Sequence, residues 1–289
     1  MNPEVLIIGC GFLGEAAAEL FSARGKRVLG LVRGADSMAA LAGRSFETAA
    51  CDVTDPSSVE ALSPRLRNVP IAIYAVSSGR GGAETYAAVY REGLRRVINN
   101  WNPGRVIFVG STSVYGQTDG SWVTEKSPAL PDRETGRILL EAEQIALDSG
   151  GSVARLSGIY GPGRSLLLKK FLSGEALLEE GGHRWINQIH RDDAAAALAR
   201  LSDPDVAAGI YNVTDDTPAT QRQVYEWMAS FLGKPLPPEG SADLNRKRGW
   251  TSKRISNALM RTTGWSPAYP SYRDALPRLL SAIQPDSSE

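Results

Sequence analysis

Short apolar runs alternate with amphipathic segments along most of the chain. The runs "EVLIIGC" (4–10) and "KRVLGLVR" (26–33) are rich in aliphatic and β-branched residues and predict strands. Between them, apolar residues recur at every third or fourth position, which predicts a helix; these residues are Leu13, Ala16, Ala17, Leu20 and Phe21. Gly25 follows as a left-handed cap would. The segment therefore predicts a βαβ unit.

The same alternation continues to about residue 160, and a further helix and strand follow at 189–213. Further apolar runs predict strands at 45–53, 69–78, 105–116, 152–161 and 209–213, and helical patterns lie at 85–101, 136–147 and 189–201. Strands that are apolar on both faces and separated by helices indicate a parallel sheet covered on both sides. The predicted fold class is therefore α/β, a Rossmann-type doubly wound parallel sheet.

Pro and Gly become frequent after about residue 160, which indicates a different organisation there. We expect a Rossmann domain at 1–161, to which residues 189–213 return. The remaining segments, 162–188 and 214–289, are expected to form a smaller substrate-binding region that acts as a lid. The sequence contains no clear linker between the two parts.

The composition favours a cytoplasmic protein that handles small molecules. The 289 residues carry no formal net charge, so the chain lacks the basic excess that favours nucleic acids or anionic lipids. Cys10 and Cys51 are too few for a disulfide framework and lack the spacing of a zinc site. The amino terminus has no basic signal region, and no apolar run reaches the length that spans a bilayer. We expect no metal, membrane or nucleic-acid partner.

A G-x-G-x-x-G motif joins the first strand to the first helix, the position that a dinucleotide-binding turn requires. Gly9 would allow the tight turn, and Gly14 would let the helix pack on the strand. Gly11 would let the backbone N–H groups of Phe12 and Leu13 approach a diphosphate at the positive end of the helix. A plain turn without a ligand is the alternative interpretation.

The end of the second strand bears on the choice of nicotinamide cofactor. NAD-binding proteins place an acidic residue about 20 positions after the glycines, whereas NADP-binding proteins place an arginine near the 2′-phosphate. This chain has Arg33 at that point, so we expect NADP in preference to NAD. A solvated arginine is the alternative, and Asp36 keeps NAD open.

Six ordered motifs resemble the extended short-chain dehydrogenase/reductases, the NAD(P)-dependent epimerase/dehydratase family. They are the glycine turn, "CDV" (51–53), "STSVYG" (111–116), "GIYGPGR" (158–164), "IHRDDAAAA" (189–197) and "GIYNV" (209–213). The likeness runs from residue 5 to about residue 276. It implies an NAD(P)-binding domain and a small substrate, in many relatives a phosphate-bearing sugar. Relatives also suggest a helix-mediated homodimer, although nothing in this sequence shows one.

The resemblance assigns roles to five further residues. It implies that Asp52 and Val53 line the adenine, that Ala75 and Ser77 lie along the dinucleotide, and that Ser111 lies beside the nicotinamide. Each has a structural alternative, since Asp52 could cap a helix and the others could end a strand or bond loop backbone.

The family's usual acid is a tyrosine with a lysine four residues later on one helix, where the ammonium lowers the tyrosine pKa toward working pH. Aligned on "PDRETGRILLEAE", these positions fall on Thr135 and Leu139. No tyrosine of the chain is followed by lysine at the fourth position. The chain is therefore identified as an atypical member of the family.

Three residues are candidates for substitute acid–base chemistry. Tyr115, four residues after Ser111, is the best placed, although a packing role is its alternative. For His190 we expect a satisfied core histidine, and for His183 a solvated one. Two isolated histidines do not make a metal site.

The strongest positive charge of the smaller region could hold a substrate phosphate or could simply be solvated. It comprises Arg164, Arg246, Lys247, Arg248, Lys253 and Arg254.

Two functions remain open from the sequence. The first is an atypical NAD(P)-dependent oxidoreductase, epimerase or dehydratase in which Ser111 orients a carbonyl or hydroxyl group, and Tyr115 or the substrate handles the proton. The second is a catalytically silent NADP-binding redox sensor or scaffold, since Thr135 and Leu139 replace the tyrosine acid and its lysine.

Overall fold

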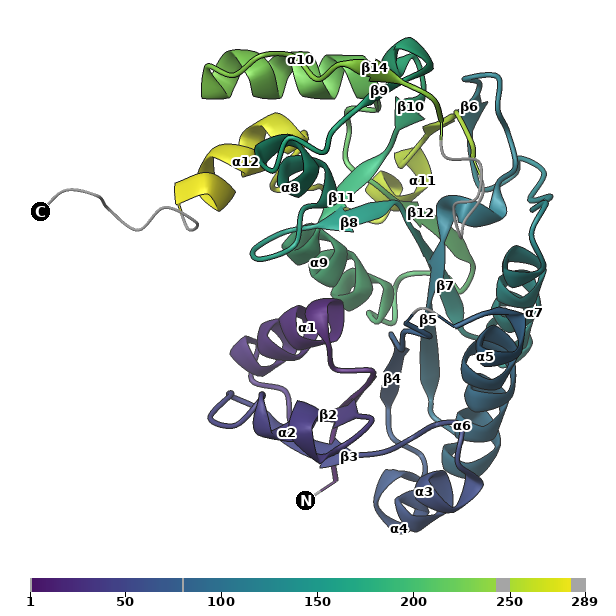
Figure 1. Cartoon of the computed structure of the whole chain (residues 1–289). Coiled ribbons are helices and arrows are strands. Elements are labelled where there is room, and N and C mark those ends of the chain that lie inside the picture. Colours follow the sequence, from purple (N-terminus) through teal and green to yellow (C-terminus); the bar gives the residue numbers. More distant parts are fainter. Residues whose placement is uncertain (1, 80, 243–249, 282–289) are drawn as a thin grey trace, which may run out of the picture.

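The chain folds around a seven-stranded parallel sheet in the computed structural model, which describes residues 2–79, 81–242 and 250–281 (Figure 1). The strand order is β12-β7-β5-β4-β1-β2-β3, and every neighbouring pair is parallel. The strands are β1 (Val5–Ile8), β2 (Val28–Val32), β3 (Glu47–Ala50), β4 (Ile71–Tyr74), β5 (Arg105–Ser111), β7 (Ser152–Leu156) and β12 (Ile210–Val213). The α/β fold class predicted from the sequence is confirmed.

Helices cover both faces of the sheet, as the doubly apolar strands require. On one face α1 (Phe12–Ala23) packs against α9 (Arg191–Leu201). The other face is covered by α3 (Pro56–Ala61), α5 (Ala83–Tyr86), a π-helical segment (Ala87–Glu92), α6 (Gly93–Trp101) and α7 (Glu134–Asp148). Two short helices, α2 (Ala35–Ala39) and α4 (Ser63–Leu66), lie in connections. Each face thus has its own apolar core.

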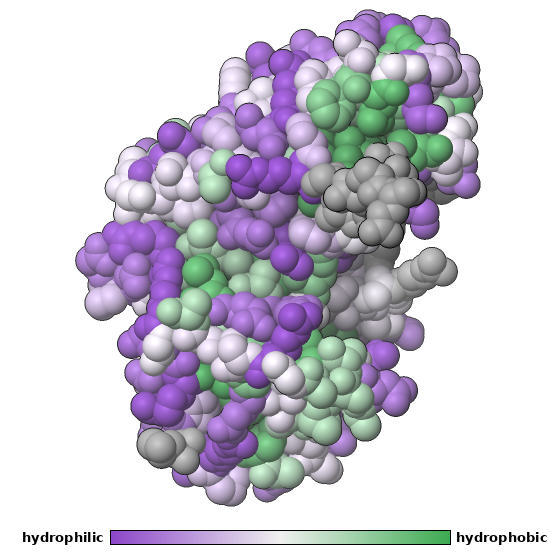
Figure 2. Space-filling view, turned by 90° about the vertical axis from the view of Figure 1, so that its left-hand side faces the viewer, coloured by the Kyte–Doolittle hydropathy of each residue, from purple (hydrophilic) through white to green (hydrophobic). Residues whose placement is uncertain are grey.

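A second group of elements lies beyond the carboxyl ends of β5 and β7 (Figure 1). We call this group the upper region. Its helices are α8 (Leu166–Leu172), α10 (Gln221–Leu232), α11 (Ala258–Thr262) and α12 (Tyr272–Ser281). Residues from α8, α10 and α12 form a third apolar cluster, separate from the two that flank the sheet. Figure 2 shows an apolar area in the upper part of one face, and the exposed apolar side chains of the upper region include Leu166 and Phe231.

Within the part of the chain that the structure describes, the upper region also contains four pairs of short strands. They are β8 (Gly158–Tyr160) with β11 (Gln188–His190), β9 (Leu178–Glu179) with β14 (Glu239–Gly240), β10 (Trp185–Ile186) with β13 (Ala219–Thr220), and β6 (Trp122–Val123) with β15 (Arg254–Ile255). In each pair the partners come from segments far apart in the sequence. Local patterns therefore could not predict them.

The single strand expected at 152–161 is two strands, β7 and β8, separated by Ser157. The Ser157 N–H donates to the Val213 carbonyl of the main sheet, whereas the next N–H, that of Gly158, donates to the Asn187 carbonyl. The chain thus changes partner within one residue. This break is where the polypeptide leaves the sheet for the upper region.

Candidate active site

The glycine turn between β1 and α1 has the geometry that its sequence predicts. Gly9 has φ +89°, and a Cβ there would lie 2.6 Å from the Val76 backbone. A Cβ on Gly14 would lie 2.3 Å from the Gly9 carbonyl oxygen. At Gly11, in contrast, a Cβ would meet nothing within 4 Å. The first and last glycines are thus needed by the protein's own packing, and the middle one borders open space at the start of a helix, where an anion would be stabilised.

A cleft of about 840 Å³ opens from this turn along the carboxyl ends of the strands. This is where open parallel sheets bind ligands. Ten of the sequence-predicted residues line it: Gly9, Gly11, Phe12, Leu13, Arg33, Asp52, Val53, Ala75, Ser77 and Ser111. Gly14 lies behind the turn, against Gly9. The cleft therefore joins residues from five strand ends into one continuous surface.

At one end of the cleft lie Arg33 and Asp52. Arg33 is exposed and has no acidic side chain within 4 Å among the residues that the structure describes. Ser37 lines the cleft beside it, whereas Asp36 does not. One carboxylate oxygen of Asp52 accepts hydrogen bonds from the N–H and hydroxyl of Thr54. The cap of α3 is the next aspartate along, Asp55, so the capping alternative for Asp52 is wrong.

At the other end of the cleft lie Ser111, Leu139 and Ser157. Ser111 caps a short 3-10 turn, and its hydroxyl accepts a hydrogen bond from the Ser113 N–H at 3.2 Å. Leu139, at the aligned lysine position, is buried and forms part of the cleft wall. Thr135, at the aligned tyrosine position, is not part of that wall. Leu139 therefore makes this part of the cleft wall apolar.

Sequence reasoning did not find several of the lining residues. Ser157 lines the cleft because the chain changes sheets there, which the run of apolar residues does not reveal. Residues 84–86 and 88–90 also line it, from the helical connection after β4. Ser37 was the one with a usable signal, since it follows Arg33 by four residues.

Tyr115 does not reach the cleft. Its side chain is fully buried, and its hydroxyl donates to Asn212 Oδ1 at 2.9 Å and accepts from Arg155 Nη1 at 2.8 Å. Arg155 in turn forms a buried ion pair with Glu143. Burial raises the Tyr115 pKa from its ordinary value. The geometry therefore favours the packing interpretation over the expected proton transfer.

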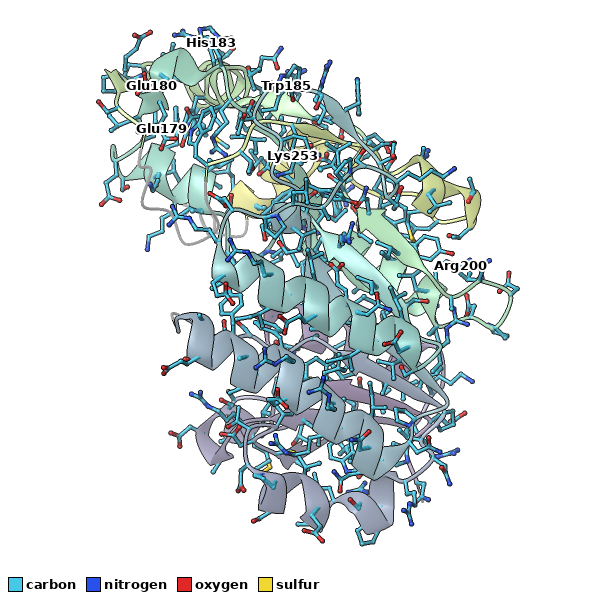
Figure 3. The ribbon with its side chains drawn as sticks, turned by 90° about the vertical axis from the view of Figure 1, so that its right-hand side faces the viewer. Glu179, Glu180, His183, Trp185, Arg200 and Lys253 are labelled. Atoms are coloured by element: carbon cyan, nitrogen blue, oxygen red, sulfur yellow. The ribbon has the colours of Figure 1, made fainter. Side chains whose placement is uncertain are left out.

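The histidines occupy the two environments expected of them. His190 is buried, caps α9 by accepting from the Asp192 N–H at 3.3 Å, and packs against the rings of Tyr160 and Tyr269. Burial lowers its pKa. His183 is exposed at the outer edge of the upper region (Figure 3). The structure describes no group of three or more His, Cys, Asp or Glu side chains that could hold a metal ion.

The expected cationic cluster does not form one surface. Arg246, Lys247 and Arg248 lie outside the described residues. Lys253 is only 4% exposed and donates from Nζ to the Tyr115 carbonyl at 2.7 Å and to Thr251 Oγ1 at 2.9 Å. Figure 3 shows it below Trp185, on the side of the upper region nearer the sheet. We expected Lys253 to be solvated or to bind a phosphate. Instead its side chain is buried and connects two distant segments of the chain.

Arg164 and Arg254 lie in environments different from that of Lys253. Arg164 lines the cleft. The Arg254 guanidinium lies over the rings of Trp122 and Trp185, with centroids 5.2 and 5.0 Å away.

Within the described residues, no helix is both long and apolar enough to cross a membrane.

Comparisons with known proteins agree with this geometry. Residues 5–214 match the family model described as NAD dependent epimerase/dehydratase. Protein YeeZ of Escherichia coli K12 is 30% identical over 276 residues, which covers 92% of this chain and 96% of that protein. A 3-diazoavenalumate denitrifying reductase of a Streptomyces species is 30% identical over 313 residues, covering 95% and 99%.

Among solved structures, one of a Methylobacillus flagellatus protein of the NAD-dependent epimerase/dehydratase type is 30% identical, with a TM-score of 0.80. The alignment covers 98% of this chain and 99% of that one. The likeness therefore extends through the upper region as well as the sheet.

Proposed function

Because the chain belongs to the NAD-dependent epimerase/dehydratase family, we propose that it is an NADP-linked oxidoreductase that acts on a small substrate without a tyrosine–lysine pair. The observation that carries the proposal is the single cleft that runs from Arg33, past the open side of Gly11, to Ser111. The full-length likeness to a reductase supports oxidoreduction. Nucleotide sugars remain the first substrates to test, since the resemblance to the extended enzymes implies them.

The residues of the cleft fit a nicotinamide dinucleotide. The N–H groups at the start of α1 would hold its diphosphate, Asp52 and Val53 its adenosine, and Ser111 the substrate oxygen beside the nicotinamide. When bound, such a cofactor supplies or accepts a hydride. Leu139 and the neighbouring apolar wall would exclude water from that position, which strengthens each polar contact there.

The missing acid restricts the substrate. Tyr115 is buried with a raised pKa, and the wall near Ser111 carries Leu139 where relatives have lysine. A serine hydroxyl can donate a hydrogen bond, but it is too weak an acid to give up its proton near neutral pH. Tyr86 and Tyr90 also line the cleft, but both side chains are buried. The site therefore suits a substrate whose reduced form is a stabilised anion or carries its own proton donor, with Ser111 orienting the oxygen.

Cofactor preference is tested by titrating NADPH and NADH into the protein. We expect NADPH to bind more tightly, because Arg33 and Ser37 line the cleft and Asp36 does not. Replacing Arg33 by Ala should weaken NADPH binding by about 10- to 100-fold, the value of a charge-assisted contact, and leave NADH binding unchanged. Asp36→Asn is the matched control and should alter neither. Tighter binding of NADH by the unmodified protein would refute the preference.

Turnover is tested with NADPH and a panel of nucleotide sugars and small carbonyl compounds. Consumption of NADPH in the presence of one of them would identify an enzyme. Ser111→Ala should then lower kcat by about 100-fold, as the loss of an oriented donor does at other sites, without loss of cofactor binding. A variant with full kcat would exclude Ser111 from the chemistry.

A second function has one specific observation in its favour, the apolar side chain at Leu139. A protein that binds NADP but cannot move protons could report the redox state of its cofactor to a partner. Tight binding without conversion by any substrate, together with a partner recovered in only one redox state, would support this redox sensor over the oxidoreductase.

A further inference from the structure

The turn that leads from β8 to α8 presents an arginine to the cleft. Its conformation is fixed by two backbone hydrogen bonds between Gly161 and Arg164, of 2.8 and 3.0 Å. The Arg164 side chain is exposed, lines the cleft and, among the described residues, has no acidic side chain within 4 Å. An arginine with a fixed backbone and no counter-charge is suited to bind an anion.

This turn packs directly against the glycine turn. The Arg164 guanidinium carbon lies 5.0 Å from the centre of the Phe12 ring, and Phe12 is the first residue of α1. A Cβ on Gly161 would lie 3.3 Å from the tip of the same ring. Arg164 is therefore held beside the amino terminus of α1, although 152 positions of sequence separate it from Phe12.

A second arginine, Arg191, packs against the same ring but differs from Arg164 in its partner and in its position relative to the cleft. The Arg191 guanidinium carbon also lies over Phe12, 5.3 Å from the ring centre. However, Arg191 Nε donates to Asp192 Oδ1 at 3.0 Å, so its charge is compensated within the protein. Arg191 is also absent from the lining of the cleft. Of the two, Arg164 is the one available to a ligand.

We infer that Arg164 binds the diphosphate of the dinucleotide, opposite the N–H groups at the start of α1. The inference rests on the proposed function, since it requires a dinucleotide in the cleft. The helix terminus and the guanidinium would then hold the anion from two sides, and stacking on Phe12 orders the side chain before the ligand arrives. Arg164 would serve NADH and NADPH alike, whereas Arg33 would serve only the 2′-phosphate.

The test measures the affinities of Arg164→Gln for NADPH, NADH, ADP-ribose and adenosine 2′-monophosphate by calorimetry. The first three ligands share the diphosphate, and we expect their Kd to rise by about 10- to 100-fold. The fourth lacks it and should bind as it does to the unmodified protein. Arg191→Gln, which removes a guanidinium from the same ring, is the matched control and should change none of the four.

Each other outcome overturns the inference in a recognisable way. If Arg164→Gln binds NADPH and NADH as tightly as the unmodified protein, Arg164 makes no diphosphate contact, and the proposed function stands. A loss confined to NADPH would assign Arg164 to the 2′-phosphate instead. If the unmodified protein binds neither dinucleotide, the proposed function and this inference fail together.

Discussion

Lys253 carries a charge in a place that disfavours it, and this makes the stability of the protein depend on pH. The side chain is 4% exposed, its two hydrogen-bond acceptors are neutral oxygens, and Arg184 adds a like charge nearby. Burial is the main cause that lowers the Lys253 pKa from 10.5 to about 8. We expect that replacing Lys253 by Met, which has similar length and no charge, will expose this cost.

The direction in which the free energy of unfolding changes with pH follows from which state binds the Lys253 proton more tightly. Below pH 8 both the folded and the unfolded chains hold the Lys253 proton, and the folded chain bears the cost of the buried charge. Between pH 8 and pH 10.5 the unfolded chain alone keeps it, so the free energy of unfolding rises with pH. From about pH 7 to about pH 9.5 the gain is about 2 kcal/mol.

The assay is urea denaturation followed by circular dichroism, on the unmodified protein and on Lys253→Met, at several pH values in that range. The variant also loses the hydrogen bond to the Tyr115 carbonyl, but that loss does not depend on pH. The stability of the unmodified protein relative to the variant should therefore increase by about 2 kcal/mol. Lys169→Met, on an exposed position of α8, should show no such trend. A stability difference between Lys253→Met and the unmodified protein that stays constant across the range would refute the reasoning.

Three further substitutions test the packing described above. Gly14→Ala would force a Cβ to 2.3 Å from the Gly9 carbonyl oxygen, so we expect a loss of about 1–3 kcal/mol in thermal or urea unfolding and weaker NADPH binding. Glu143→Gln leaves the buried Arg155 guanidinium without its carboxylate and should cost about 3–5 kcal/mol, measured by urea denaturation. Tyr115→Phe removes one donor and one acceptor and should cost about 1–3 kcal/mol with kcat unchanged; a large fall in kcat would restore Tyr115 as an acid.

The parts of the molecule that the sequence predicted are those determined locally. The strand–turn–helix of the glycine motif depends on residues within ten positions of each other, and the sheet follows from strands apolar on both faces. Side-chain directions at the sheet edge depend on distant partners. The Tyr115 hydroxyl faces away from the cleft because Asn212, 97 positions away, accepts its hydrogen bond.

The direction of the Lys253 side chain also depends on a residue that is distant in the sequence. By sequence it belongs to a basic segment and was grouped with Arg254, its neighbour. Successive side chains of an extended segment point to opposite sides, so Arg254 lies over two tryptophan rings while Lys253 reaches the Tyr115 carbonyl, 138 positions away. Which of the two turns inward is decided by the segments packed against them, and a single chain's pattern does not contain that information.

The change of hydrogen-bond partner at Ser157 and Gly158 has a consequence for how this architecture can diversify. Because one peptide unit is anchored to the sheet and the next to the upper region, the boundary between the two is a fixed point of the backbone. We therefore expect loops beyond it to tolerate changes in length without altering the register of β7 against β5. Changes to the upper region can thus alter what that region contacts while the glycine turn and the strand ends that line the cleft keep their positions.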